Sequence, residues 1–131
     1  MAKMCNQGLH VALEILFGAA VRPTFYLGLY TAPTTEPLAT ASLGTLTEPS
    51  AGGYARVELV DADWTATGNV ITNILKTIAA SGGAFGNCYG YFITDCLSGT
   101  AGLLYAVEHF AAAYNIADGG SMQITPAITG S

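Results

Sequence analysis

Few side chains in this sequence have the type and spacing that catalysis needs. His109 directly follows Glu108, but neighbouring residues on a regular strand point to opposite faces, so the two do not form a hydrogen-bonded pair in one site. His10 and Glu14 lie one helical turn apart without a third ligand, which favours a solvated helix face over a metal site. No triad of nucleophile, base and acid is recognisable. The sequence therefore predicts a protein that is not an enzyme and has no catalytic residues.

Asp61, Asp63 and Trp64 form a short segment in which a ligand site is conceivable. Two carboxylates this close together suit Ca²⁺, and an exposed tryptophan beside them suits a sugar. Asp side chains also hydrogen-bond their own backbone in turns, and we favour a turn here. The glycines of GGAFGNCYG (82–90) lack the spacing of a dinucleotide loop and precede strand-forming residues, which indicates a hairpin. We expect no cofactor and no metal.

The cysteines Cys5, Cys88 and Cys96 occur without a C-x-x-C spacing. Their number is odd, and an extended segment between Cys88 and Cys96 would hold these two too far apart to bridge. We therefore expect free, buried thiols, as in a protein made and kept in a cytoplasm.

Charged residues are scarce in this chain. It has 4 Lys and Arg and 9 Asp and Glu in 131 residues, or 10 %, against roughly a quarter in a typical soluble domain. Such a surface suits a subunit in an assembly, because interface cores are depleted of charged side chains. The alternative is a neutral, glycine-rich β-domain that is monomeric.

Composition also excludes two kinds of partner. The net charge is −5, and Lys3, Arg22, Arg56 and Lys76 are too few and too scattered to follow a phosphate backbone. No apolar run approaches the roughly 20 residues of a membrane-spanning helix. We expect neither nucleic acid nor a membrane as a partner.

A helix is predicted from Asn6, which can cap it, to about Phe17, with Gly18 as its C-terminal stop. An apolar stripe follows the helical spacing. The stripe comprises Leu9, Ala12, Leu13, Leu16 and Phe17, and Gln7, His10 and Glu14 lie away from it. After Pro23 the spacing changes to two over residues 25–30, which predicts a strand covered on both faces.

Further strands are predicted over residues 54–60, 70–79, 87–94, 103–110 and 121–129, with glycine-rich turns between most of them. In the first of these, Val57 and Leu59 face one side and Arg56 and Glu58 the other, which is typical of a half-solvated strand. Six to eight short strands after one helix indicate a mainly β protein. We expect a β-sandwich or jelly-roll-like domain preceded by one N-terminal α-helix.

The whole chain, 1–131, is expected to form a single domain, with a helical N-terminal segment at 1–20 and a long loop or arm at 31–53. The arm is rich in Thr, Pro, Ser, Ala and Gly. Loops of this length are uncommon inside compact domains and are often functional. The arm either lies on a partner or is an ordinary surface excursion with a short edge strand around Thr45.

Several segments, in their order along the chain, carry a resemblance to a known class of proteins. After the N-terminal helix come FYLGLYT (25–31), LTEPSAGGYARVEL (46–59), WT (64–65), GNCYGYFITD (86–95) and DGGSMQITPAIT (118–129). In this order they resemble small structural proteins of tailed bacteriophages. The resemblance spans nearly the whole chain and includes no catalytic signature.

The resemblance implies a β-sandwich that forms homo-oligomers, with a trimer favoured, and sits on the capsid exterior of a virion as a decoration or cement protein. It implies the HK97-type major capsid protein of a tailed phage as partner. Three weak, neutral contacts per trimer add up to firm binding. The alternatives are a tail, baseplate or fibre subunit, or a carbohydrate-binding β-sandwich module.

Two surfaces are expected to contact the partner, namely one side of the helix and the arm. The candidate residues are Leu9, Leu13, Leu16 and Phe17 on the helix, and Thr34, Glu36, Pro37, Leu46 and Pro49 on the arm. Alternatively, the helix stripe packs on the protein's own sheet.

Overall fold

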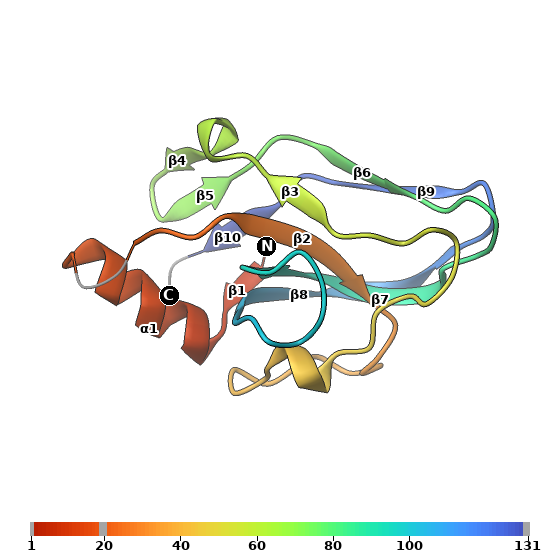
Figure 1. Cartoon of the computed structure of the whole chain (residues 1–131), viewed down its shortest axis with the longest axis horizontal. Coiled ribbons are helices and arrows are strands. Elements are labelled where there is room, and N and C mark those ends of the chain that lie inside the picture. Colours follow the sequence, from red (N-terminus) through yellow and green to blue (C-terminus); the bar gives the residue numbers. More distant parts are fainter. Residues whose placement is uncertain (1, 19–20, 130–131) are drawn as a thin grey trace.

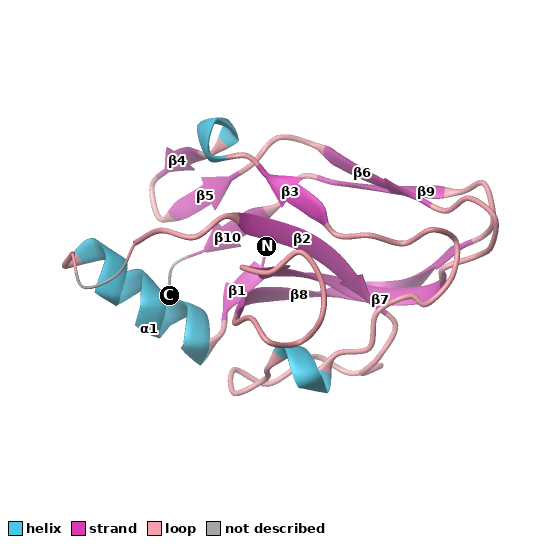
Figure 2. Cartoon of the chain, in the orientation of Figure 1, coloured by secondary structure: helices cyan, strands magenta, loops and turns pink. Residues whose placement is uncertain are grey.

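Strands are the main regular structure of the chain, formed by segments of alternating apolar side chains, with one helix near the N-terminus (Figures 1 and 2). The computed structural model describes residues 2–18 and 21–129. The helix is α1 (Asn6–Leu16), and the strands are β1 (Ala2–Met4), β2 (Phe25–Tyr30), β3 (Val57–Leu59), β4 (Thr65–Thr67), β5 (Val70–Thr72), β6 (Lys76–Ala79), β7 (Gly86–Thr94), β8 (Leu104–Ile116), β9 (Ser121–Ile124) and β10 (Ala127–Thr129). Short 3-10 turns occupy Leu43–Thr45 and Asp61–Asp63. The predicted mainly β fold with one N-terminal helix is confirmed.

The strands form one curled eight-stranded sheet and a separate two-stranded ribbon. The sheet order is β3-β2-β7-β8-β1-β10-β5-β4, and the ribbon pairs β6 with β9. The edge strands β3 and β4 are joined by residues 60–64 alone, so the two edges are held close together and the sheet curls. In Figure 1, α1 lies at one end of the molecule and the ribbon at the other.

Apolar side chains cover both faces of the central strands β2, β7 and β8. On one face the main core includes Leu27, Leu29, Leu59, Ile93 and Ala106. On the other face a second cluster includes Tyr30, Leu43, Leu46, Phe92 and Leu104. Three members of this second cluster, Ala41, Leu43 and Leu46, belong to the segment 31–53, so the predicted arm covers the protein's own sheet.

Several predicted strands differ from those observed. The predicted strand 70–79 is interrupted at Asn73, whose backbone N–H donates to Pro126 O at 2.9 Å and whose side-chain Nδ2 donates to Val60 O at 3.2 Å. Pro126 in turn separates β9 from β10, because proline has no N–H to give to a ladder. The expected edge strand around Thr45 is wrong, because Thr45 caps a 3-10 turn with Ser42.

The helix starts one residue earlier than a cap at Asn6 requires. Cys5 occupies the N-cap, because β1 holds the chain extended up to this residue and the Cys5 N–H donates to Tyr105 O at 2.8 Å. The Asn6 N–H donates a hydrogen bond to Ala39 O at 3.0 Å. Gly18, with φ of 76°, follows the helix end as predicted, and residues 1, 19 and 20 of the predicted helical segment lie outside the described residues. No helix in the described part of the chain is long and apolar enough to cross a membrane.

Alkaline pH is expected to destabilise the fold through buried tyrosines. Burial raises the pKa of Tyr105 to about 12 and raises the pKa values of Tyr30, Tyr54 and Tyr91 as well. In the unfolded chain these phenols ionise near pH 10, so above about pH 10 the folded state binds more protons than the unfolded state. The stabilisation is complete below that pH and falls by about 1.4 kcal/mol per pH unit for each such tyrosine above it. Urea unfolding across this range measures the slope, and a constant free energy of unfolding up to about pH 11 would contradict it.

Candidate functional site

The sequence of α1 determines which of its faces meets the sheet. Gly8 lies against the backbone of Tyr105 in β8, where even a Cβ atom would overlap main-chain atoms. The neighbouring Gln7 accepts a hydrogen bond from the Leu104 N–H through Oε1 at 3.0 Å. Val11 packs against the main core on the same side. The close approach at Gly8 therefore turns the leucine stripe of the helix away from the sheet.

The result is an exposed apolar ridge on α1, formed by Leu9, Leu13, Leu16 and Phe17. Their exposed fractions are 44 %, 49 %, 73 % and 80 %. These four side chains were the helix candidates for partner contact, and the alternative that they pack on the protein's own sheet is wrong. A ridge of this kind in water marks an interaction surface more often than an isolated apolar residue does.

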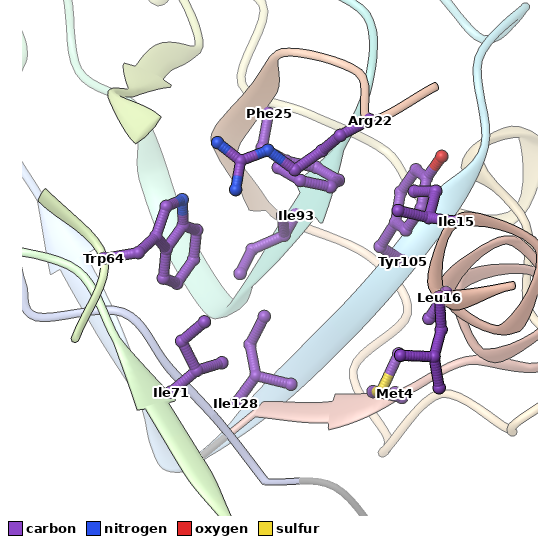
Figure 3. Close-up of a pocket in the computed structure, with 11 residues that line it drawn as sticks. Met4, Ile15, Leu16, Arg22, Phe25, Trp64, Ile71, Ile93, Tyr105 and Ile128 are labelled. Atoms are coloured by element: carbon purple, nitrogen blue, oxygen red, sulfur yellow. The ribbon is translucent and has the colours of Figure 1, made fainter. Parts of the chain in front are cut away.

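An apolar pocket lies beside the ridge, between α1 and the curled sheet (Figure 3). Its volume is ≈ 360 Å³, within the range of ligand and side-chain pockets. Its lining comes from α1, six strands and two loop positions, and includes Ile15, Leu16, Phe25, Trp64, Ile71 and Ile128. The pocket was not predicted, because its lining residues are dispersed from Met4 to Ile128 and only the curl of the sheet brings them together.

The charged groups next to the pocket are paired with one another. Arg22 lines the pocket and its Nη2 lies 2.7 Å from Asp61 Oδ2. Asp63 Oδ2 lies 3.6 Å from Lys76 Nζ. The Trp64 and Phe25 rings meet edge to face, with 6.5 Å between their centroids. Each carboxylate thus faces a cation, and among the described residues no three His, Cys, Asp or Glu side chains converge on a point that could hold a metal ion.

The arm offers less surface than expected. Thr34 and Glu36 are exposed, Pro37 is half-buried, and Glu36 pairs with Lys3 at 2.9 Å. Leu46 and Pro49 are buried, and Leu46 belongs to the second cluster under the arm. These two were proposed as contact residues and are withdrawn, because their side chains are already covered by the protein itself.

His109 and Glu108 act on opposite faces of the sheet, whereas His10 lies within ion-pair distance of Glu14. His109 stacks on Tyr30 and Tyr89, and its Nδ1 lies 2.9 Å from the Tyr30 hydroxyl. The Glu108 carboxylate helps to raise the pKa of Tyr91, and Tyr91 belongs to the main core on the opposite face. On α1, His10 lies 3.5 Å from Glu14 on an exposed surface.

A buried ion pair was missed altogether. Arg56 was expected on a solvated strand face, yet its side chain is 2 % exposed and binds both carboxylate oxygens of Glu48 at 2.9 and 2.7 Å. Alternation along a strand predicts which residues share a face, but it does not predict what covers that face. The arm that covers the Arg56 face therefore could not be predicted. The one available signal was that Arg56 is one of only four Lys and Arg residues in the chain.

Thiol reactivity is expected to differ among the cysteines. Cys5 and Cys88 are buried, and burial raises the pKa of Cys5 to about 11 and also raises that of Cys88. Because the thiolate is the reacting form, both should resist a disulfide reagent at neutral pH, while the half-buried Cys96 reacts. Mass spectrometry after native labelling identifies the sites, with a urea-unfolded sample as control. Equal labelling of all three in the native protein would contradict the burial.

No model of a known protein family matches the chain, and no curated protein sequence matches it either. Its function is therefore inferred from its own residues.

Proposed function

We propose that this protein is a non-enzymatic structural component of a tailed-bacteriophage virion. Specifically, we propose a capsid decoration or cement protein that binds the outer shell and bridges neighbouring subunits of an HK97-type major capsid protein. The observation that carries the proposal is the exposed apolar ridge of α1, with Phe17 80 % exposed. A ridge with this degree of exposure is better suited to permanent contact in an assembly than to a freely diffusing enzyme.

The charge distribution supports the same proposal. The ridge lies on a chain in which only 10 % of residues are charged, and neutral surfaces suit the core of a protein interface. Repeated weak contacts of this kind become strong when several copies bind together, as in a trimer. The resemblance of the sequence to small phage structural proteins points in this direction as well.

A carbohydrate-binding function receives no support from the geometry. Such a site needs an exposed aromatic ring beside free polar groups. Trp64 lines the apolar pocket, and Asp61 and Asp63 are both engaged by cations.

The proposal is tested on virus particles assembled with and without the protein. Particles that lack it are expected to open at a lower temperature and to be more sensitive to chelators. Adding back the purified protein should restore resistance, whereas the variant with Leu9→Ser and Leu13→Ser on the ridge should not. Leu97→Ser serves as the matched control, because Leu97 is a similarly exposed leucine (59 %) that lies in the loop 95–103 and is not part of the ridge.

Unchanged resistance of particles that lack the protein would overturn the proposal. Copy number distinguishes the alternative place in the virion. A decoration protein is present in many copies spread over the shell, whereas a tail, baseplate or fibre subunit is present in few. Quantitative mass spectrometry of purified particles measures this ratio.

A further inference from the structure

We infer that the apolar pocket beside α1 accepts Phe17 from a second copy of this chain. The tip of α1 in one copy then fills the pocket of the next. The inference rests on the proposed function, which calls for self-assembly, and adds the contact by which the copies join.

The lining of the pocket requires an apolar occupant. Leu16, Trp64, Ile71 and Ile128 offer carbon surface, and a polar group moved there from water would lose its hydrogen bonds without replacement. The one permanent charge in the lining, on Arg22, is already satisfied by Asp61 at 2.7 Å. An anionic amphiphile therefore gains less from this site than a hydrocarbon side chain does.

Phe17 is presented as a fixed projection rather than as part of a loose loop. Its backbone N–H donates to Leu13 O at 3.1 Å, and the N–H of Gly18 donates to Ile15 O at 3.1 Å. Gly18 then turns the chain with φ of 76°, which a residue with a side chain rarely adopts. Since these hydrogen bonds already hold the backbone of Phe17 and Gly18, inserting the ring into a pocket costs little further conformational entropy.

The projection follows directly on a residue of the pocket lining. Leu16 lines the pocket and is 73 % exposed, and Phe17 is the next residue. Val21, at 91 % exposed, lies beside Arg22 of the lining and extends the apolar surface. A molecule that carries both halves of a contact can join to its copies head to tail, and such copies close into a small ring when the rotation between them permits.

The inference is tested by light scattering after size exclusion, over a range of concentrations. The native protein is expected to be an oligomer, with a mass of two or more times 13.5 kDa. Phe17→Ser, which removes the projection, and Ile71→Trp, which fills the pocket, should each be monomeric. Ile71 is suited to this purpose because it lines the pocket and is 38 % exposed, and Ala12→Phe fills the same pocket from the helix if Ile71→Trp lowers the melting temperature.

Mixing the two variants gives the decisive measurement. The Phe17→Ser chain retains its pocket and the Ile71→Trp chain retains its projection, so an equimolar mixture should form a one-to-one heterodimer and nothing larger. Leu38→Ser, at a side chain that is 75 % exposed on the arm, is the control and should keep the native mass. A monomeric native protein, a Phe17→Ser variant with native mass, or a mixture that stays monomeric would each overturn the inference.

The failure of this inference is distinguishable from the failure of the proposed function. A native protein that is monomeric but still restores the resistance of virus particles overturns the self-contact alone. An oligomer that depends on Phe17 but restores nothing overturns the virion function alone.

Discussion

Replacing Arg56 with alanine is expected to lower the free energy of unfolding by about 3–5 kcal/mol, the range for removing one partner of a buried ion pair. The Arg56 side chain is 2 % exposed, and Glu48 is 24 % exposed. Once the guanidinium is gone, the one hydrogen-bond donor left to the Glu48 carboxylate among the described residues is the hydroxyl of Tyr54, which donates to its Oε1 at 2.8 Å. A largely desolvated anion without its cation is the main cause of the loss.

Arg56 also joins three separate parts of the chain. Its guanidinium binds Glu48 in the arm, and it donates to Cys96 O at 2.8 Å and Gly99 O at 2.7 Å in the loop between β7 and β8. The same group lies 5.3 Å from the ring centroid of Phe92 in the second cluster. Alanine therefore releases the arm and the loop together, and we expect both to lose protection in hydrogen exchange.

Arg22→Ala is the matched control for this experiment. The Arg22–Asp61 pair has a similar separation, 2.7 Å, but its side chains are 48 % and 56 % exposed. An exposed pair of this kind contributes under about 1 kcal/mol. Urea unfolding of both variants measures the difference, and the double variant with Arg56→Ala and Glu48→Ala should lose less than the sum of the single losses. Equal, small losses at Arg56 and Arg22 would contradict the role assigned to the buried pair.

Strong local patterns in the sequence were sufficient to predict part of the fold. The alternation over residues 25–30 gave β2 at its observed bounds, because both of its faces meet apolar clusters. The three-residue strands β1 and β4 could not be predicted, because three residues carry no measurable period and owe their conformation to pairing with β8, β10 and β5. The predicted strand 70–79 failed for a related reason, since the bonds that divide it at Asn73 come from Val60 and Pro126.

The candidate surface was predictable as a set of residues but not in its orientation. Helical spacing grouped Leu9, Leu13, Leu16 and Phe17 on one side, as observed. Hydrophobicity would place that side on the sheet, but the distance between helix and sheet is set by Gly8, whose role is to have no side chain. The pocket next to the ridge depends on the curl of the whole sheet, which no local pattern encodes.

Gly8→Ala is expected to destabilise the fold by about 2–3 kcal/mol, although alanine is the better helix former. The change gains about 1 kcal/mol of intrinsic helix propensity. Against this, the new methyl group would overlap main-chain atoms of Tyr105, which cannot rotate away as a side chain can. Overpacking of this kind costs up to about 3 kcal/mol, and a helix pushed outward also loses the Gln7 to Leu104 hydrogen bond, worth about 1 kcal/mol. The steric and hydrogen-bond losses together exceed the gain in propensity.

The displaced helix should also impair assembly, because α1 carries the ridge and forms one wall of the pocket. Gly44→Ala is the control, since the nearest atom to a Cβ at Gly44 is Ser42 Oγ at 3.9 Å. Urea unfolding should show the loss of stability for Gly8→Ala alone, and hydrogen exchange should show lost protection in α1 while β7 and β8 remain protected. A Gly8→Ala protein that is as stable as the native one would mean that the contact between α1 and β8 adjusts easily. In that case the outward orientation of the ridge would no longer follow from the absence of a side chain at residue 8.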